Sequence, residues 1–300
     1  MDLEKIIGNG EIKELLTKTV QTDKVLHSYL LIGKDGIGKK QIAIQFAKMI
    51  LCQNEEVKPC NCCKSCAQMD SKNHPDFDII LPDGKTIKIE QIRNLQNRVA
   101  EKPIISNRKV YIIDQSNLMT KEAQNCLLKT LEEPPEYVTL ILITSNEASI
   151  LNTIKSRCTK LVFRQLSNEE IKEYIKTNLK IDKISSNLLE LIGGSIGKAY
   201  EIQEKIELYE KIEELANKIE IVDKIELFKQ AEFIYKNKEQ IDEILDYLNV
   251  IFLSQAQKGN YQYLDCIRQI EQTKRNLTAN ANFDMSVDHM WLKVWEEVNR

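Results

Sequence analysis

The stretch YLLIGKDGIGKKQIAIQFA, residues 29–47, decides the fold class. Its first four residues are apolar and typical of a buried strand, and its last part has the spacing of a helix with one apolar face. The loop between them fits the pattern G-x-x-x-x-G-K, with Gly33, Gly36, Gly38 and Lys39. Glycines let backbone N–H groups turn toward phosphate oxygens at a helix N-terminus, where the lysine reaches the terminal phosphates. The stretch predicts a nucleotide-binding α/β fold.

Further apolar runs of the same kind follow at residues 110–113, 139–144 and 161–163, separated by amphipathic helical stretches. Short apolar runs that alternate with such helices predict parallel strands covered on both faces. The alternative that residues 33–40 form only a glycine turn is disfavoured, because a strand and a helix flank the loop and a second strand ending in an acidic residue follows.

The loop departs from a working ATPase site in two places. Lys40 stands where a Ser or Thr hydroxyl would hold Mg²⁺. The run at 110–113 ends in Asp114, but Gln115 then replaces the glutamate that polarises the attacking water in related ATPases. A neutral amide cannot serve as that base. We therefore expect ATP or ADP to bind weakly or not at all at a degenerate site, and we expect no hydrolysis by the chain itself.

A cluster of cysteines follows the helix after the loop. Cys52, Cys60, Cys63 and Cys66 give the spacing C-x7-C-x2-C-x2-C, which is typical of a tetrahedral zinc site. A complete set of four thiolates predicts a structural Zn²⁺ that orders the loop. Cys62 is expected to be a bystander, although the spacing also allows it to replace Cys63, and free thiols are the remaining alternative.

Composition narrows the class of protein. A net charge of −3, with 42% hydrophobic and 29% charged residues, excludes a disordered tail and a strongly basic DNA-coating protein. No apolar run approaches the ~20 residues of a membrane span, and the N-terminus lacks a secretion signal. The expected location is the cytoplasm, where thiols stay reduced and can bind metal.

Proline and glycine divide the chain into expected domains. All six prolines lie at or before Pro135, and after Gly197 only Gly259 remains, so the last hundred residues are predicted to be helical. Their apolar stripes favour a packed bundle over a coiled coil, because the repeat does not persist. We expect an α/β domain at 1–164 with the zinc module at 52–66, a small helical lid at 165–205, and an all-α domain at 206–300.

Four features together resemble the bacterial clamp-loader family of AAA+ proteins: the phosphate loop, the cysteine module inserted after its helix, LLKTLEEPPE at 127–136, and Ser156-Arg157-Cys158. The likeness runs from about Ile6 to Ala199. Within this family the two losses from the loop resemble the delta-prime branch, whose nucleotide sites have decayed, and not the ATP-hydrolysing gamma/tau branch. Residues 74–93 are also similar to a delta-prime signature.

The resemblance implies a function in DNA replication. It implies a largely non-hydrolysing stator of a pentameric ring, part of the DNA polymerase III holoenzyme, which loads the sliding clamp on primed DNA. The implied partners are gamma/tau and delta subunits, the clamp, and DNA through the assembled ring, with no membrane. Arg157, with Ser156 and Cys158 as its motif, would act in trans as an arginine finger in a neighbour's ATP site, and residues 206–300 would form the collar.

Two other functions stay open at this point. The chain could be an ATP-hydrolysing subunit of the gamma/tau kind that tolerates Lys40 and Gln115. It could also be a zinc-dependent nucleic-acid adaptor in which the phosphate loop has no role. Ring order, the collar contacts and direct DNA contacts do not follow from the sequence.

Overall fold

The computed structural model describes residues 3 and 6–299, and its contacts divide them into two compact units. The first runs to Ile171 and also contains Gly194–Gly197, and the second contains Lys172–Gly193 and the chain from Lys198 onward. The boundary expected at 164/165 lies seven residues before this division. The boundary expected at 205/206, between a lid and a collar, stays a prediction.

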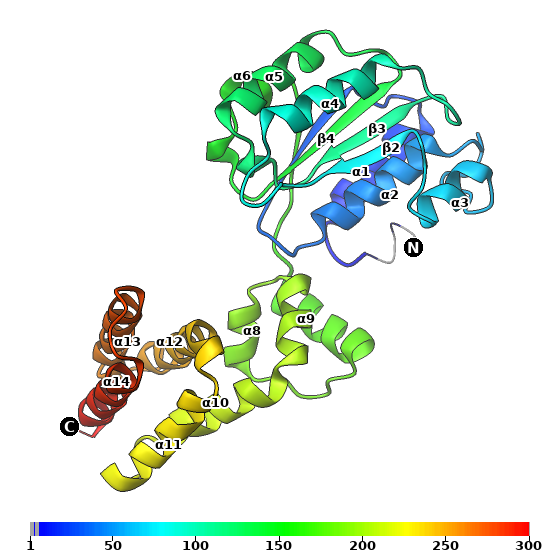
Figure 1. Ribbon diagram of the computed structural model, residues 1–300. Helices are drawn as coiled ribbons and strands as arrows, with labels where there is room; N and C mark the ends of the chain where they lie inside the picture. The colour runs from blue at the N-terminus through cyan, green and yellow to red at the C-terminus, as the bar shows by residue number, and fades with distance from the viewer. Residues whose placement is uncertain (1–2, 4–5, 300) are drawn as a thin grey trace. The chain divides into compact units, whose positions relative to one another are not determined.

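The first unit is built on a five-stranded sheet in which every pair of neighbours is parallel (Figure 1). The strand order is β2-β3-β4-β1-β5, so β1 lies between β4 and β5. The strands are β1 Ser28–Ile32, β2 Phe77–Ile80, β3 Lys109–Ile113, β4 Val138–Thr144 and β5 Thr159–Val162. Four of them, β1, β3, β4 and β5, confirm the prediction that the apolar runs of the sequence form strands. The prediction lacked β2, an edge strand that carries Asp78 and is only partly buried.

Helices cover both faces of this sheet (Figure 1). α1 and α2 pack on one face, and α4, α5 and α6 pack on the other. The helical elements of this unit, in chain order, are α1 Gly10–Gln21, α2 Lys39–Leu51, α3 Lys64–Asp70, α4 Ile89–Ala100, η2 Ser116–Leu118, α5 Lys121–Glu132, η3 Glu147–Ser149 and α6 Asn152–Lys155.

The two layers follow from the alternation of side chains along each strand. In β1, Leu31 belongs to the core against α1 and α2, while Leu30 belongs to the core against α4 and α5. The same alternation separates Ile112 from Ile113 in β3. Because both faces of β1, β3 and β4 are buried, these three strands are mostly apolar, and this is the signal that made them recognisable in the sequence.

The second unit is helical. α7 Asn168–Tyr174 crosses the division between the units and leads into the π-helical turn η4 Ile175–Leu179. Then come α8 Ser186–Ile192, α9 Ile196–Glu204, α10 Ile206–Lys218, α11 Lys224–Lys236, η5 Lys238–Gln240, α12 Ile241–Gln257, α13 Tyr263–Thr278 and α14 Phe283–Val298.

The apolar stripes of the last hundred residues form the core of this unit. α12 packs against α8, α10 and α13, and α14 packs against α11 and α13. The predicted stripes are buried where these helices meet, as at Ile212 in α10 and at Leu248 and Phe252 in α12. The prediction of an all-α C-terminal region is thus confirmed. Among the described residues, no helix is both long and apolar enough to cross a membrane.

Candidate functional site

The phosphate loop connects the carboxyl end of β1 to α2, as the sequence predicts. Gly36 and Gly38 have φ values of 75° and 90°, in the left-handed region that favours glycine, and Gly38 directly precedes the helix. Lys39 is 5% exposed, and its ammonium donates to the carbonyls of Gly33 and Lys34, both at 2.5 Å. Burial lowers the pKa of Lys39, against the opposing influence of Asp35 and Asp114. The lysine therefore folds back on its own loop.

The second lysine of the loop forms an ion pair with Asp114, the acidic residue that directly follows β3. Lys40 Nζ is 2.9 Å from Asp114 Oδ2, and the Asp114 side chain is only 11% exposed. The other carboxylate oxygen accepts from the backbone N–H of Gln115 at 3.0 Å, and the Gln115 side chain is exposed. The structure thus brings together Lys40 and Asp114, two of the residues assigned to the nucleotide site. It pairs them with each other.

The segment Gly194–Gly197 covers part of the loop. The backbone N–H of Gly197 donates to the Gly36 carbonyl at 3.1 Å. A Cβ atom on Gly36 would lie 2.0 Å from Ser195 Oγ, so this close approach requires glycine. The glycine-rich stretch 193–197 therefore includes a direct contact of the phosphate loop.

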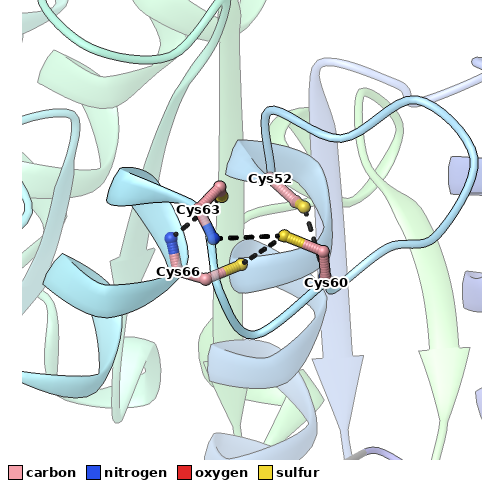
Figure 2. A group of neighbouring side chains, drawn as sticks. All are labelled: Cys52, Cys60, Cys63 and Cys66. Atoms are coloured by element: carbon pink, nitrogen blue, oxygen red, sulfur yellow. Dashed lines mark hydrogen bonds between the residues drawn. The ribbon is translucent and has the colours of Figure 1, made fainter.

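The four predicted metal ligands converge at the end of α2 and the start of α3 (Figure 2). The sulfur atoms of Cys52, Cys60, Cys63 and Cys66 all lie within 4.8 Å of one another. Cys60 Sγ and Cys66 Sγ are 4.0 Å apart, close to the ~3.8 Å expected between two thiolates on one tetrahedral Zn²⁺. Cys62 is exposed and is not among the four cysteines whose sulfur atoms converge, which favours Cys63 as the ligand.

Backbone N–H groups prepare this cluster for negative charge. Cys60 N donates to Cys52 Sγ at 3.3 Å, and Cys63 N donates to Cys60 Sγ at 3.4 Å. The N–H groups of Cys62 and Cys63 lower the pKa of Cys60 to about 6, whereas burial raises the pKa of Cys52 and Cys66. A divalent cation would supply the charge that deprotonates the two buried thiols. The donor set and its spacing fit a structural zinc ion.

A buried polar network attaches the cysteine module to the α/β core. The hydroxyls of Ser65 and Ser106 both donate to the carbonyl of Leu51, at 2.7 and 2.8 Å. His74 Nε2 lies 2.9 Å from Ser65 Oγ, and His74 Nδ1 accepts from the backbone N–H of Asp76 at 3.0 Å. Burial lowers the pKa of His74. This histidine is a structural hydrogen-bonding group and does not join the cysteine cluster.

Asp76 fixes the loop that precedes β3. Its side chain is fully buried, and its two oxygens accept the backbone N–H groups of Ile104, Ile105 and Ser106 at 2.7, 2.8 and 2.9 Å. Residues 74–93 were recognisable only by their resemblance to a delta-prime signature, which indicates no role for Asp76. An aspartate directly after His74-Pro75 was the only local signal, and its partners lie 28 to 30 residues further along the chain.

Arg157 lies just after α6 and before β5, at the amino end of the sheet. Its guanidinium contacts Glu132 Oε1 at 2.8 Å and donates to the Thr153 carbonyl at 2.9 Å, and its side chain is 35% exposed. Ser28, the first residue of β1, donates its hydroxyl to the Arg157 carbonyl at 2.6 Å. The contact with Glu132 was not foreseen, because LLKTLEEPPE at 127–136 served only to indicate the family resemblance.

The other residues of the arginine motif are structural. Ser156 Oγ donates to the Thr153 carbonyl at 3.1 Å, at the end of α6. Cys158 is buried, and its burial raises the pKa of the thiol to about 11, so this cysteine is a small core residue. Arg157 is therefore the member of the motif whose charged group reaches solvent.

Comparison with known proteins places these features in a family. A family model described as DNA polymerase III, delta subunit, matches residues 8–167. The delta' subunit of DNA polymerase III from Bacillus subtilis is 29% identical over 315 aligned positions, which cover 95% of this chain and 95% of that protein. The tau/gamma subunit from Haemophilus influenzae is 34% identical over 171 positions, 57% of this chain and 25% of that protein.

The likeness therefore extends over nearly the whole delta' relative and over a quarter of the tau/gamma relative. Among solved structures, a gamma-subunit-related protein from Thermotoga maritima aligns with 94% of this chain and 99% of its own, at 18% identity and a TM-score of 0.47.

Proposed function

This chain belongs to the DNA polymerase III delta-subunit family, and we propose that it serves there as a delta-prime-like stator of the clamp loader. In this proposal it assembles with gamma/tau and delta subunits into a pentameric AAA+ ring that places the sliding clamp on primed DNA. It does not hydrolyse ATP itself, and it contributes Arg157 to the ATP site of a neighbour.

The contact between Lys40 and Asp114 carries the first part of this proposal. In a working phosphate loop, a hydroxyl from the loop and an acidic residue together hold Mg²⁺, which bridges the terminal phosphates. Here an ammonium replaces the hydroxyl and lies 2.9 Å from the acid. Mg²⁺ needs ligand oxygens at 2.0–2.1 Å in an octahedron, so the lysine competes directly for its place. Gln115 also stands where a glutamate would act as the base.

A nucleotide at this loop would be held by Gly33, Gly36, Gly38 and the two lysines. The fixed ammonium of Lys40 supplies part of the positive charge that the metal would bring. We therefore expect binding of ATP or ADP to be weak, largely independent of Mg²⁺, and without turnover.

The exposed guanidinium of Arg157 carries the second part. Its planar, permanently charged group can match phosphate oxygens and neutralise charge that develops in the transition state. Arginine fingers of this kind contribute about 10³ to 10⁵ in rate in well-studied phosphoryl-transfer systems. Arg157 has no phosphate loop of its own nearby, because it lies at the opposite end of β1 from residues 33–40.

Zinc has a structural role in this proposal. Cys52, Cys60, Cys63 and Cys66 would close the coordination shell, so no position stays open for water or substrate. The ion would order the loop between α2 and α3 and would not take part in ATP hydrolysis.

Two measurements test the proposal. The purified chain with ATP and Mg²⁺ should release no phosphate above the background of a sample without protein. The complex reconstituted with gamma/tau and delta should lose most of its DNA- and clamp-stimulated ATPase when Arg157 is replaced by Ala, while it still assembles. Arg268→Ala is the matched control, since Arg268 also pairs with a carboxylate at 2.7 Å but lies in α13.

The 34% identity to a tau/gamma subunit favours an ATP-hydrolysing subunit as the second candidate. Steady phosphate release by the isolated chain would establish that function in place of the first. A zinc-dependent nucleic-acid adaptor is the third candidate, and it requires that chelation abolish DNA binding while the ring stays assembled.

A further inference from the structure

Glu132 holds Arg157 from within the same chain. The guanidinium Nη2 of Arg157 lies 2.8 Å from Glu132 Oε1, and its Nη1 donates to the Thr153 carbonyl at 2.9 Å. Two different nitrogens are thus fixed by partners from two different helices, α5 and α6. A guanidinium is planar, so two such contacts define the direction in which its remaining donors point.

The surroundings of this pair are rigid. Glu132 is the last residue of α5, and Pro134 and Pro135 prevent the helix from continuing. The backbone of Arg157 is anchored by the hydroxyl of Ser28, which is 1% exposed. Arg157 also lies at the carboxyl ends of α5 and α6, where helix dipoles favour a cation.

The ion pair between Arg157 and Glu132 is partly accessible to solvent. The Arg157 side chain is 35% exposed and that of Glu132 is 50% exposed, so the guanidinium stays accessible to solvent while it is paired. An exposed ion pair contributes little to the stability of a fold. The main effect of this pair is therefore to orient the guanidinium of Arg157.

We propose that Glu132 is a positioning residue for the arginine finger: it holds the guanidinium of Arg157 at the angle from which it meets the phosphate of a neighbouring subunit. This inference rests on the proposed function, because it assumes that Arg157 acts in trans. Glu132 itself touches no phosphate and takes no part in proton transfer. Its effect on hydrolysis passes through Arg157.

The test uses the full chain in the complex with gamma/tau and delta. The variants are Glu132→Gln, which removes the charge and keeps the shape, Arg157→Ala, and the two combined. Glu133→Gln is the matched control, since Glu133 is the next residue, is also exposed, and forms no ion pair with any residue in the described part of the chain. The readouts are kcat and KM for ATP with DNA and clamp present, and the thermal unfolding midpoint of each chain.

We expect Glu132→Gln to lower kcat about two- to five-fold with an unchanged KM, because the finger contributes mainly in the transition state. Glu133→Gln should behave as the unaltered chain, and both variants should unfold at the same temperature. In the Arg157→Ala background, Glu132→Gln should have no further effect, since the group that it positions is gone.

Two results would overturn the inference and leave the proposed function intact. One is a Glu132→Gln complex that is as active as Glu133→Gln while Arg157→Ala is impaired. The other is a loss from Glu132→Gln that multiplies with that of Arg157→Ala, which would place Glu132 in a separate role. If Arg157→Ala itself is fully active, the proposed function fails, and the positioning role fails with it.

Discussion

Replacing Asp76 by Ala should cost the first unit about 3–5 kcal/mol of its free energy of unfolding. The fully buried Asp76 accepts three backbone N–H groups, from Ile104, Ile105 and Ser106, at 2.7 to 2.9 Å. A hydrogen bond to a charged group contributes about 1.5–3 kcal/mol, so three sum to at least about 4.5. Water that enters the space left by the carboxylate can accept some of these N–H groups and so recovers part of the lost free energy, which gives the expected loss of about 3–5 kcal/mol.

Asp76→Asn provides the matched comparison. The amide keeps one oxygen, which can still accept two of the three N–H groups, and turns its NH₂ group toward the third. Its shape is almost unchanged, so no cavity contributes to the difference. We expect this variant to lose about half as much stability as the alanine variant, roughly 2 kcal/mol.

The assay must distinguish the two units. Trp291 and Trp295, the two tryptophans of the chain, both lie in α14 of the second unit. Tryptophan fluorescence therefore follows the second unit and serves as the internal control. Hydrogen exchange of residues 104–106 and of β3, measured in increasing urea, follows the first unit. Exchange in α14 should be unchanged in both variants.

An Asp76→Ala variant that loses less than about 1 kcal/mol would refute this reasoning, as would equal losses from Ala and Asn. The first result would mean that water replaces the carboxylate without cost. The second would mean that the charge of Asp76, and not the number of N–H groups it accepts, determines the effect.

Two further predictions concern the same region. Burial lowers the pKa of His74 below its ordinary value of about 6.5, so the unfolded chain takes up the proton at a higher pH than the folded chain. The stability that neutral His74 provides is therefore complete above about pH 6.5 and is lost as the pH falls below it. In urea unfolding of the first unit between pH 7.5 and 5.5, the free energy of unfolding of His74→Gln should decline less with falling pH than that of the unaltered chain. A zinc chelator should increase hydrogen exchange in residues 52–66, while β1, β3 and β4 stay protected. Loss of protection throughout the sheet would contradict a local structural role for the metal.

Most of the sheet could be predicted because three of its five strands are buried on both faces. β1, β3 and β4 are continuous apolar runs, and a strand covered by helices has no other pattern available. β2 escaped prediction because Asp78 interrupts its short apolar stretch, whereas β5, an edge strand of the same length, was recognised from the apolar residues 161–163. The helices of the second unit could be predicted from their apolar stripes, but their packing partners could not.

In the candidate site, local spacing was informative and long-range pairing was not. The phosphate loop and the four cysteines each lie within a short stretch, so their spacing alone indicates the chemistry. The contacts of Lys40 with Asp114 and of Arg157 with Glu132 join residues 74 and 25 positions apart. Nothing in the spacing of these residues indicates that the fold brings their charges together.

Under the proposed function, the arrangement of β1 explains how the chain can lack its own ATPase activity and still provide an arginine to a neighbouring subunit. The phosphate loop follows Ile32 at the carboxyl end of this strand, while Ser28 at its amino end holds the backbone of Arg157. Five residues of strand separate the two ends by about 13 Å. Lys40 can therefore replace a metal ligand at one end without moving any contact of Arg157 at the other. If the two ends are independent in this way, Lys40→Thr should alter the dependence of nucleotide binding on Mg²⁺ and leave the ATPase that Arg157 supports in the complex unchanged.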